Sequence, residues 1–291
     1  MKLPLVIANW KMNLPSFNDV EITWVNTPAR QWFSEFYPIL DDSLGSITDP
    51  FEPHYLLNAG VAPPLTDFRE AANHSFYHEK TKKLAGVRQI YLGFQDVSPK
   101  RSGSRTGELS ATMLENCIDS SYGKAQYFCI IGHSERREFH NETDEIISEK
   151  LRRLLETDII PVVCIGETLK DFEKGLTKEV LKNQIDVIFN SLESDKNIII
   201  AYEPVWAIGS GKPAVPTDVN EIHKFIKDTV QSCAKITDIN VLYGGSVNAE
   251  NSKSFFEQKY IDGALVGGAS LDPVEFGKIC INYIHQMETQ E

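Results

Sequence analysis

Short apolar runs rich in β-branched residues recur along the whole chain and constrain its fold. There are eight of them, and segments of helical character separate successive runs. Parallel neighbours in a sheet need crossover connections, which helices usually supply. The pattern therefore predicts an α/β fold in which eight parallel strands close into a (β/α)8 barrel surrounded by helices. The predicted strands are Leu3–Ala8, Tyr55–Ala62, Ile90–Gln95, Tyr127–Gly132, Ile159–Ile165, Ile198–Glu203, Ile239–Tyr243 and Ala264–Gly267.

The connecting segments carry recognisable helix signals. Thr143–Glu156 has apolar and charged side chains on opposite faces at helical spacing. Its apolar stripe is formed by Ile147, Lys150, Leu151, Leu154 and Leu155. Thr168 and Asp171 resemble a capping box at the start of the next helix, and Pro273 suits the first turn of the last helix.

The chain is longer than a minimal barrel of this kind. It has 291 residues, against a usual size of roughly 250. The excess lies early, in the connections after strands one and two at 14–58 and 67–89. Within the first of these, Leu40–Pro53 is rich in turn-forming residues and is predicted to be a surface excursion. Since no linker or repeat marks a boundary, we expect one domain over residues 1–291.

Composition excludes several functional classes. The formal charge of -12 and a pI near 5.1 oppose binding to nucleic acid or to an acidic membrane surface. Five cysteines without a CxxC pair suggest neither a disulfide framework nor a zinc site, so we interpret them as reduced core thiols. The first apolar run is too short for a signal peptide, and no apolar stretch approaches membrane-spanning length. A soluble cytoplasmic protein is expected.

The stretch Ile198–Lys212, IIIAYEPVWAIGSGK, predicts a strand that ends in a catalytic carboxylate. Pro204 disfavours helical backbone at Glu203, which leaves the carboxylate at the carboxyl end of the strand, where α/β folds place their chemistry. The apolar and glycine-spaced residues that follow suggest a hinged lid over a dry site. The alternative is an ordinary strand-end carboxylate that faces water, followed by simple turns.

Two further strand ends carry polar candidates. Lys11, in NWKMN after the first strand, places a positive charge suited to an anionic substrate, although most lysines are solvated surface groups. His133, in IIGHSERR after the fourth strand, can donate to a carbonyl or carry protons, and a helix that begins near Ser134 favours its neutral form. A lone histidine is more often structural. Arg136 and Arg137 can alternatively form ordinary ion pairs with Glu135, Glu138 or Glu142.

Glycine-rich turns follow strands seven and eight, at Tyr243–Val247, YGGSV, and Val266–Ser270, VGGAS. Small residues let backbone N–H groups approach an anion closely, and barrels often bind phosphate at these two loops. Tight turns with no ligand are the alternative interpretation.

Together these segments resemble the signature motifs of the triosephosphate isomerase family. NWKMN, IIGHSERR, VVCIGET, AYEPVWAIGSGK, YGGSV and VGGASL occur in family order across almost the whole chain. The resemblance implies interconversion of dihydroxyacetone phosphate and glyceraldehyde 3-phosphate through an enediolate. It implies no metal and no organic cofactor.

The resemblance also implies residue roles. Glu203 would be the base, His133 the neutral electrophile, Lys11 the positive charge and Asn9 a hydrogen-bond donor. Glu135 would support the lysine. The phosphate would be bound by backbone N–H groups of Gly209, Ser246, Gly267 and Gly268.

Ser102–Glu108, SGSRTGE, resembles the family loop whose threonine, here Thr106, enters the neighbouring subunit, so the resemblance implies a homodimer. Arg105 and a long segment Leu109–Ala125 depart from the usual pattern. Two other functions stay open: isomerisation of a four-carbon tetrulose phosphate, and a catalytically silent phosphate-binding barrel. Presence of all four catalytic candidates argues against the silent barrel.

Overall fold

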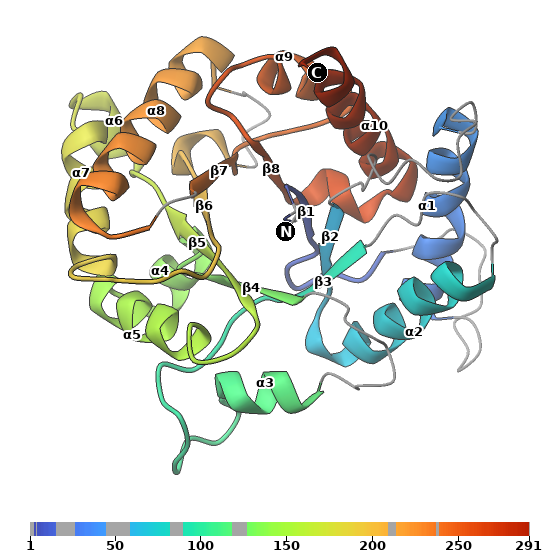
Figure 1. Ribbon diagram of the computed structural model, residues 1–291, viewed down its shortest axis with the longest axis horizontal. Coiled ribbons are helices and arrows are strands. Elements are labelled where there is room, and N and C mark those ends of the chain that lie inside the picture. Colours follow the sequence, from blue (N-terminus) through green and yellow to red (C-terminus); the bar gives the residue numbers. More distant parts are fainter. Residues whose placement is uncertain are drawn as a thin grey trace.

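A computed structural model describes residue 3 and residues 5–15, 27–44, 59–81, 90–117, 127–208, 214–236 and 239–290. Eight parallel strands form a closed barrel in sequence order, and β1 pairs with β8 to complete it (Figure 1). The strands are β1 Val6–Asn9, β2 Ala59–Ala62, β3 Ile90–Phe94, β4 Tyr127–Ile131, β5 Ile160–Ile165, β6 Ile198–Tyr202, β7 Ile239–Tyr243 and β8 Gly263–Val266. The predicted (β/α)8 barrel is confirmed.

Helices surround the barrel on its outer face (Figure 1). They are α1 Pro28–Leu44, α2 Leu65–Thr81, α3 Ala111–Cys117, α4 Ser134–His140, α5 Asp144–Leu154, α6 Leu169–Glu173, α7 Thr177–Ile188, α8 Pro216–Cys233, α9 Ser252–Phe256 and α10 Pro273–Gln290, with short 3-10 helices η2 Val205–Ala207 and η3 Gly268–Leu271. The predicted helix signals are confirmed. Thr143 and Thr168 cap α5 and α6 through their side chains, and Pro273 is the first residue of α10.

Alternating strand residues fill two separate apolar layers. On β5, Val162 and Cys164 belong to a cluster of strand residues that fills the barrel interior, whereas Val163 and Ile165 pack with the helices. This alternation follows from the two-residue period of a strand. The barrel is therefore a packed core, and chemistry is confined to its ends.

Four strands, β3, β4, β6 and β8, end one residue before the sequence predicts. β6 ends at Tyr202 rather than Glu203, although the Glu203 N–H still donates to the Ile165 carbonyl at 2.8 Å. Pro204 has no N–H, so pairing stops there. β4 ends at Ile131 because Gly132 has a φ of 70°, which turns the chain into α4.

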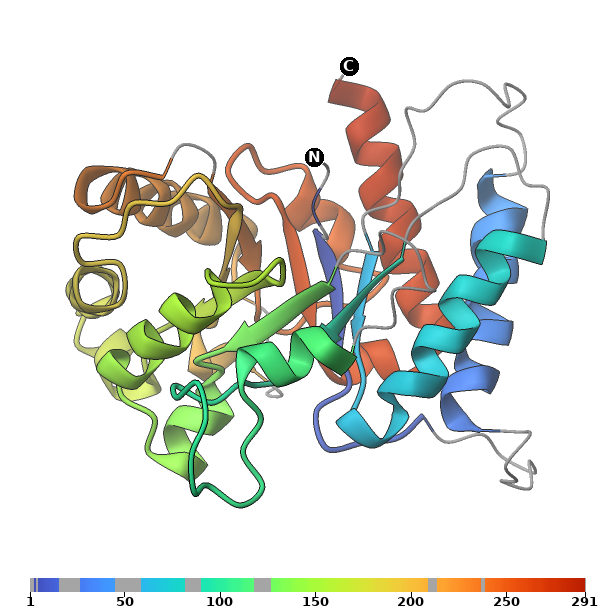
Figure 2. The same cartoon turned by 60° about the horizontal axis from the view of Figure 1, so that its bottom comes forward.

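The early connections contribute α1 and α2, which lie side by side, and α1 also packs against α10 (Figures 1 and 2). Trp32 of α1 stacks on Phe36 at 4.7 Å between ring centroids and contacts Phe276 of α10. The prediction of a surface excursion from Leu40 is wrong at its start, because α1 continues to Leu44 and Leu40 is buried. The remainder of that prediction, residues 45–53, lies outside the described residues.

The loop between β3 and α3 projects away from the barrel (Figures 1 and 2). Residues 101–108 are exposed along their whole length, and Thr106 lies among them. Ion pairs attach the base of the loop to α5 and the turn after it: Lys100 Nζ lies 2.7 Å from Glu149 Oε2, and Arg101 binds Glu156.

The five cysteines are free thiols. Cys129, Cys164 and Cys280 are buried and Cys233 is half-buried, but Cys117 is exposed at the end of α3, so the interpretation as core thiols is wrong there. Among the described helices, none has the length and apolar character needed to cross a bilayer.

Candidate active site

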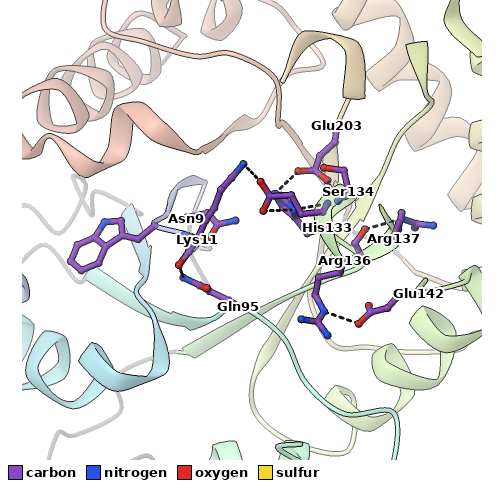
Figure 3. Close-up of polar contacts among 12 residues, drawn as sticks. Asn9, Lys11, Gln95, His133, Ser134, Arg136, Arg137, Glu142 and Glu203 are labelled. Atoms are coloured by element: carbon purple, nitrogen blue, oxygen red, sulfur yellow. Dashed lines mark hydrogen bonds and ion pairs between the residues drawn. The ribbon is translucent and has the colours of Figure 1, made fainter. Parts of the chain in front are cut away.

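The four predicted catalytic side chains meet at one end of the barrel. Asn9 ends β1 and Lys11 follows it, His133 follows β4, and Glu203 follows β6 (Figure 3). These are the carboxyl ends of parallel strands, where barrel enzymes place their catalytic groups.

Glu203 is a buried carboxylate whose two oxygens have different partners. Its Oε1 lies 3.0 Å from Nε2 of His133, and its Oε2 accepts a 2.8 Å hydrogen bond from the backbone N–H of Ser134 (Figure 3). Ser134 is the first residue of α4, so its N–H is free of intrahelical bonding and favours a negative charge. The residue is 2% exposed. The carboxylate thus contacts His133 and Ser134 and has almost no contact with bulk water.

His133 is the N-cap of α4 and its two ring nitrogens have opposite roles. Nδ1 accepts a 3.2 Å hydrogen bond from the backbone N–H of Glu135. A nitrogen that accepts an N–H carries no proton of its own, so the neutral ring places its single proton on Nε2. That proton points toward Glu203. The imidazole can therefore donate a hydrogen bond into the site while it is uncharged.

Lys11 reaches the site through an unusual backbone conformation. Its φ is 53°, in the left-handed region, which costs free energy for a residue other than glycine. The Lys11 N–H donates to Asn9 Oδ1 at 3.0 Å, and Gln95 Nε2 donates to the Lys11 carbonyl at 2.9 Å. These contacts hold the conformation. Lys11 Nζ then lies 2.7 Å from Glu135 Oε1.

Arg136 and Arg137 form structural ion pairs, and neither pairs with Glu135 or Glu138 in the described contacts. Arg136 binds Glu142 at 2.6 Å, one of the predicted alternatives. Arg137 binds Asp144 at 2.6 Å and donates to the carbonyls of Gly132 and Cys164. Arg137 thus links the residue that follows β4 to the backbone near the end of β5.

Cys164 lies next to Glu203 in the barrel interior. Burial, together with the Glu203 carboxylate, raises the pKa of the Cys164 thiol well above its usual value. The thiol stays protonated, so it places no second negative charge beside the Glu203 carboxylate.

The predicted phosphate loops lie at the same barrel end, the loop after β8 beside Lys11 and the loop after β7 beside Glu203. Gly267 is adjacent to Lys11, since a Cβ added at Gly267 would lie 3.3 Å from Lys11 Cε. Gly268 begins η3. The Ser246 N–H and hydroxyl both donate to the Ala207 carbonyl, at 3.2 and 2.6 Å. Gly209, and with it the predicted glycine lid, lies outside the described residues.

Two contributors to the site were missed by sequence reasoning. Gln95 bridges the Lys11 and Ala62 carbonyls, and nothing in the local pattern distinguishes it from a solvent-facing glutamine. Glu167 is fully buried and accepts hydrogen bonds from the Tyr202 hydroxyl and the Trp206 indole N–H. Its position two residues after β5, in VVCIGET, is the signal that could have identified it, because it is a carboxylate just past a strand end, as Glu203 is after β6.

A closed parallel barrel with a buried carboxylate, a neutral imidazole and a lysine at its carboxyl end defines an enzyme that moves protons on an anionic substrate. Residues 45–283 match the family model of triosephosphate isomerase. Triosephosphate isomerases of Sodalis glossinidius and Photorhabdus laumondii are each 40% identical over 283 residues, which cover 96% of this chain and 96% of each relative. The crystal structure of triosephosphate isomerase from Bartonella henselae superposes with a TM-score of 0.69 at 30% identity, over 96% of this chain and 98% of that chain.

The chain belongs to the triosephosphate isomerase family. Its activity is accordingly that of an intramolecular aldose-ketose isomerase acting on a small phosphorylated sugar. The family match begins at residue 45, after the catalytic candidates of β1, whereas the pairwise matches extend over nearly the whole chain.

Proposed function

We propose that this enzyme interconverts dihydroxyacetone phosphate and D-glyceraldehyde 3-phosphate with Glu203 as base and His133 as electrophile. The observation that carries the assignment is the 3.0 Å contact between His133 Nε2 and Glu203 Oε1 in a buried site. A carbon acid requires a positioned base, and its enediolate requires a nearby donor. This pair supplies both side by side, and the substrate must replace their direct contact.

In the forward reaction the Glu203 carboxylate takes a proton from the hydroxymethyl carbon of the ketose. The electron pair of that C–H bond forms the enediol double bond, and the carbonyl oxygen becomes negative. His133 Nε2–H donates to this oxygen and passes a proton between the two oxygens. Glu203 then returns its proton to the adjacent carbon, which yields the aldose.

Lys11 and Asn9 complete the electrostatics of this reaction. Lys11 Nζ balances the charge of the substrate and of the enediolate, and Glu135, 2.7 Å away, fixes its position. Backbone N–H groups of Ser246, Gly267, Gly268 and Gly209 bind the phosphate. For Ser246 this requires its N–H to exchange the Ala207 carbonyl for a phosphate oxygen.

We propose further that the enzyme is a single-domain cytoplasmic homodimer. Free cysteines suit a reducing compartment. The exposed loop that contains Thr106 suits insertion into a second copy, as the family resemblance implies. Sedimentation at micromolar concentration should give twice the 32.8 kDa mass of one chain.

The function is tested by steady-state isomerisation of glyceraldehyde 3-phosphate, followed with a coupled dehydrogenase, with phosphorylated tetruloses assayed in parallel. The expected kcat/KM for the triose phosphate approaches the diffusional ceiling of roughly 10⁸ M⁻¹s⁻¹. Faster turnover of a tetrulose phosphate would support the proposed reaction type but assign the enzyme a four-carbon substrate. Absence of turnover on either would contradict the proposal.

A further inference from the structure

Phe172 of α6 makes an aromatic contact that the reaction described so far does not use. Its ring stacks on Trp206, with 4.2 Å between the ring centroids and an interplanar angle of 27°. Phe172 is 44% exposed. A ring left that open to water on a five-residue helix adds little to the core. Its main contact therefore lies on the turn that follows Glu203.

Trp206 is held at its edge as well as at its face. The indole Nε1–H donates to Glu167 Oε1 at 2.9 Å, and the Tyr202 hydroxyl donates to the same carboxylate. Burial and the Glu167 charge raise the pKa of Tyr202 far above its usual value, so its hydroxyl stays a donor. The Glu167 carboxylate fixes the indole edge, and Phe172 restricts the rotation that this single hydrogen bond leaves free.

The turn around Trp206 connects the base to the phosphate loop. Trp206 belongs to η2, which starts two residues after Glu203, and the Val205 N–H donates to the Glu167 carbonyl at 3.1 Å. At its other end, the Ala207 carbonyl accepts both hydrogen bonds from Ser246. A displacement of the indole is therefore transmitted in both directions, to the Glu203 backbone and to Ser246.

We propose that Phe172 is a positioning residue for the isomerisation, because its stack on Trp206 fixes the η2 turn between Glu203 and Ser246. The kinetic part of this inference rests on the proposed function. Phe172 itself does not contact the reacting groups and acts through Trp206. A planar group is required at position 172, because a small or branched aliphatic side chain does not cover the indole face at this distance.

The first test compares Phe172→Ala with Phe172→Tyr and with Leu169→Ala. Leu169 is the matched control, since it is a 53% exposed apolar residue on the same helix. We expect kcat/KM on glyceraldehyde 3-phosphate to fall about tenfold in Phe172→Ala, as misplaced catalytic groups lower rates steeply. Phe172→Tyr should stay within about twofold of the wild type, because it keeps the ring. Equal activities of Phe172→Ala and Leu169→Ala would overturn the proposal.

The second test asks whether Phe172 acts through Trp206. In a Trp206→Leu background, Phe172→Ala should have almost no additional effect on kcat/KM, because the ring has lost its partner. Additive losses would overturn the proposal. Tryptophan emission supplies a readout independent of activity: Phe172→Ala should shift it to longer wavelength, and the shift should vanish in the Trp206→Leu background. An inactive wild type would contradict the proposed function, and the emission shift would then decide alone whether the stack positions the turn.

Discussion

His133 Nε2 lies 3.0 Å from Glu203 Oε1, and the two side chains are only 7% and 3% exposed. The contact joins the end of β4 to the end of β6 across a barrel mouth in which little water screens either group. Because His133 Nδ1 accepts the Glu135 N–H, the shared proton lies on Nε2. A substrate that replaces this direct contact meets a base at Glu203 and a donor at His133. The predictions below test this arrangement and the structure that supports it.

Lys11→Met should weaken substrate binding and slow turnover together. The Lys11 charge faces the substrate in both the ground state and the transition state, so KM should rise and kcat/KM should fall by on the order of 10². Steady-state kinetics measure both. Lys182→Met is the control, since Lys182 is exposed on α7 and pairs only with Asp186 one turn away in the described contacts. Wild-type constants in Lys11→Met would remove Lys11 from the site.

Gly166→Ala should destabilise the fold and displace the base. An added Cβ would lie 1.8 Å from the Glu203 carbonyl oxygen, a backbone atom that cannot move without moving Glu203. We expect a loss of about 1 to 3 kcal/mol in the free energy of unfolding, measured in urea. Gly268→Ala is the stability control, because its added methyl would meet no atom within 4 Å. Equal midpoints for the two variants would contradict the close approach.

Lys150→Met should be among the most destabilising charge removals. Lys150 is 2% exposed and its Nζ lies 2.6 Å from Asp96 and 2.5 Å from Glu142. Its removal leaves the buried Glu142 and the half-buried Asp96 short of a cation, which costs about 3 kcal/mol or more. Urea unfolding checks this, with the exposed Lys182→Met as reference. A loss below about 1 kcal/mol would show that Arg136, the other cation of this cluster, compensates.

His223 should make the folded protein less stable as the pH is lowered. Burial lowers the pKa of His223 from 6.5 to about 3, so the folded state resists the proton that the unfolded state accepts. Its contribution is complete above pH 6.5 and is lost at about 1.4 kcal/mol per pH unit as the pH falls toward 3. Between pH 6.5 and 5, His223→Gln should flatten the dependence of the unfolding free energy on pH. His285→Gln, on the exposed face of α10, should leave the slope unchanged. If the unfolding free energies of His223→Gln and the wild type changed in parallel with pH, the assignment of this pH dependence to His223 would be contradicted.

The strands and the polar groups at their ends were predictable because each depends on local pattern. β-branched runs fix the strands, and Pro204 places Glu203 at the end of one. The features that the sequence did not predict depend on contacts between distant segments. Gln95 and Glu167 take their roles from backbone atoms and side chains of other segments, and the left-handed conformation of Lys11 is maintained partly by Gln95, which follows β3. Leu40 was misread because turn-forming neighbours conceal its burial in α1.

The most direct test of the central claim is the effect of Glu203→Gln on turnover and on binding. Gln keeps the size of the side chain and removes the base, so kcat should fall by on the order of 10² to 10⁴, while affinity for a phosphate-bearing competitive ligand stays near the wild-type value. An unchanged kcat would contradict the assignment of Glu203 as the base that moves the proton.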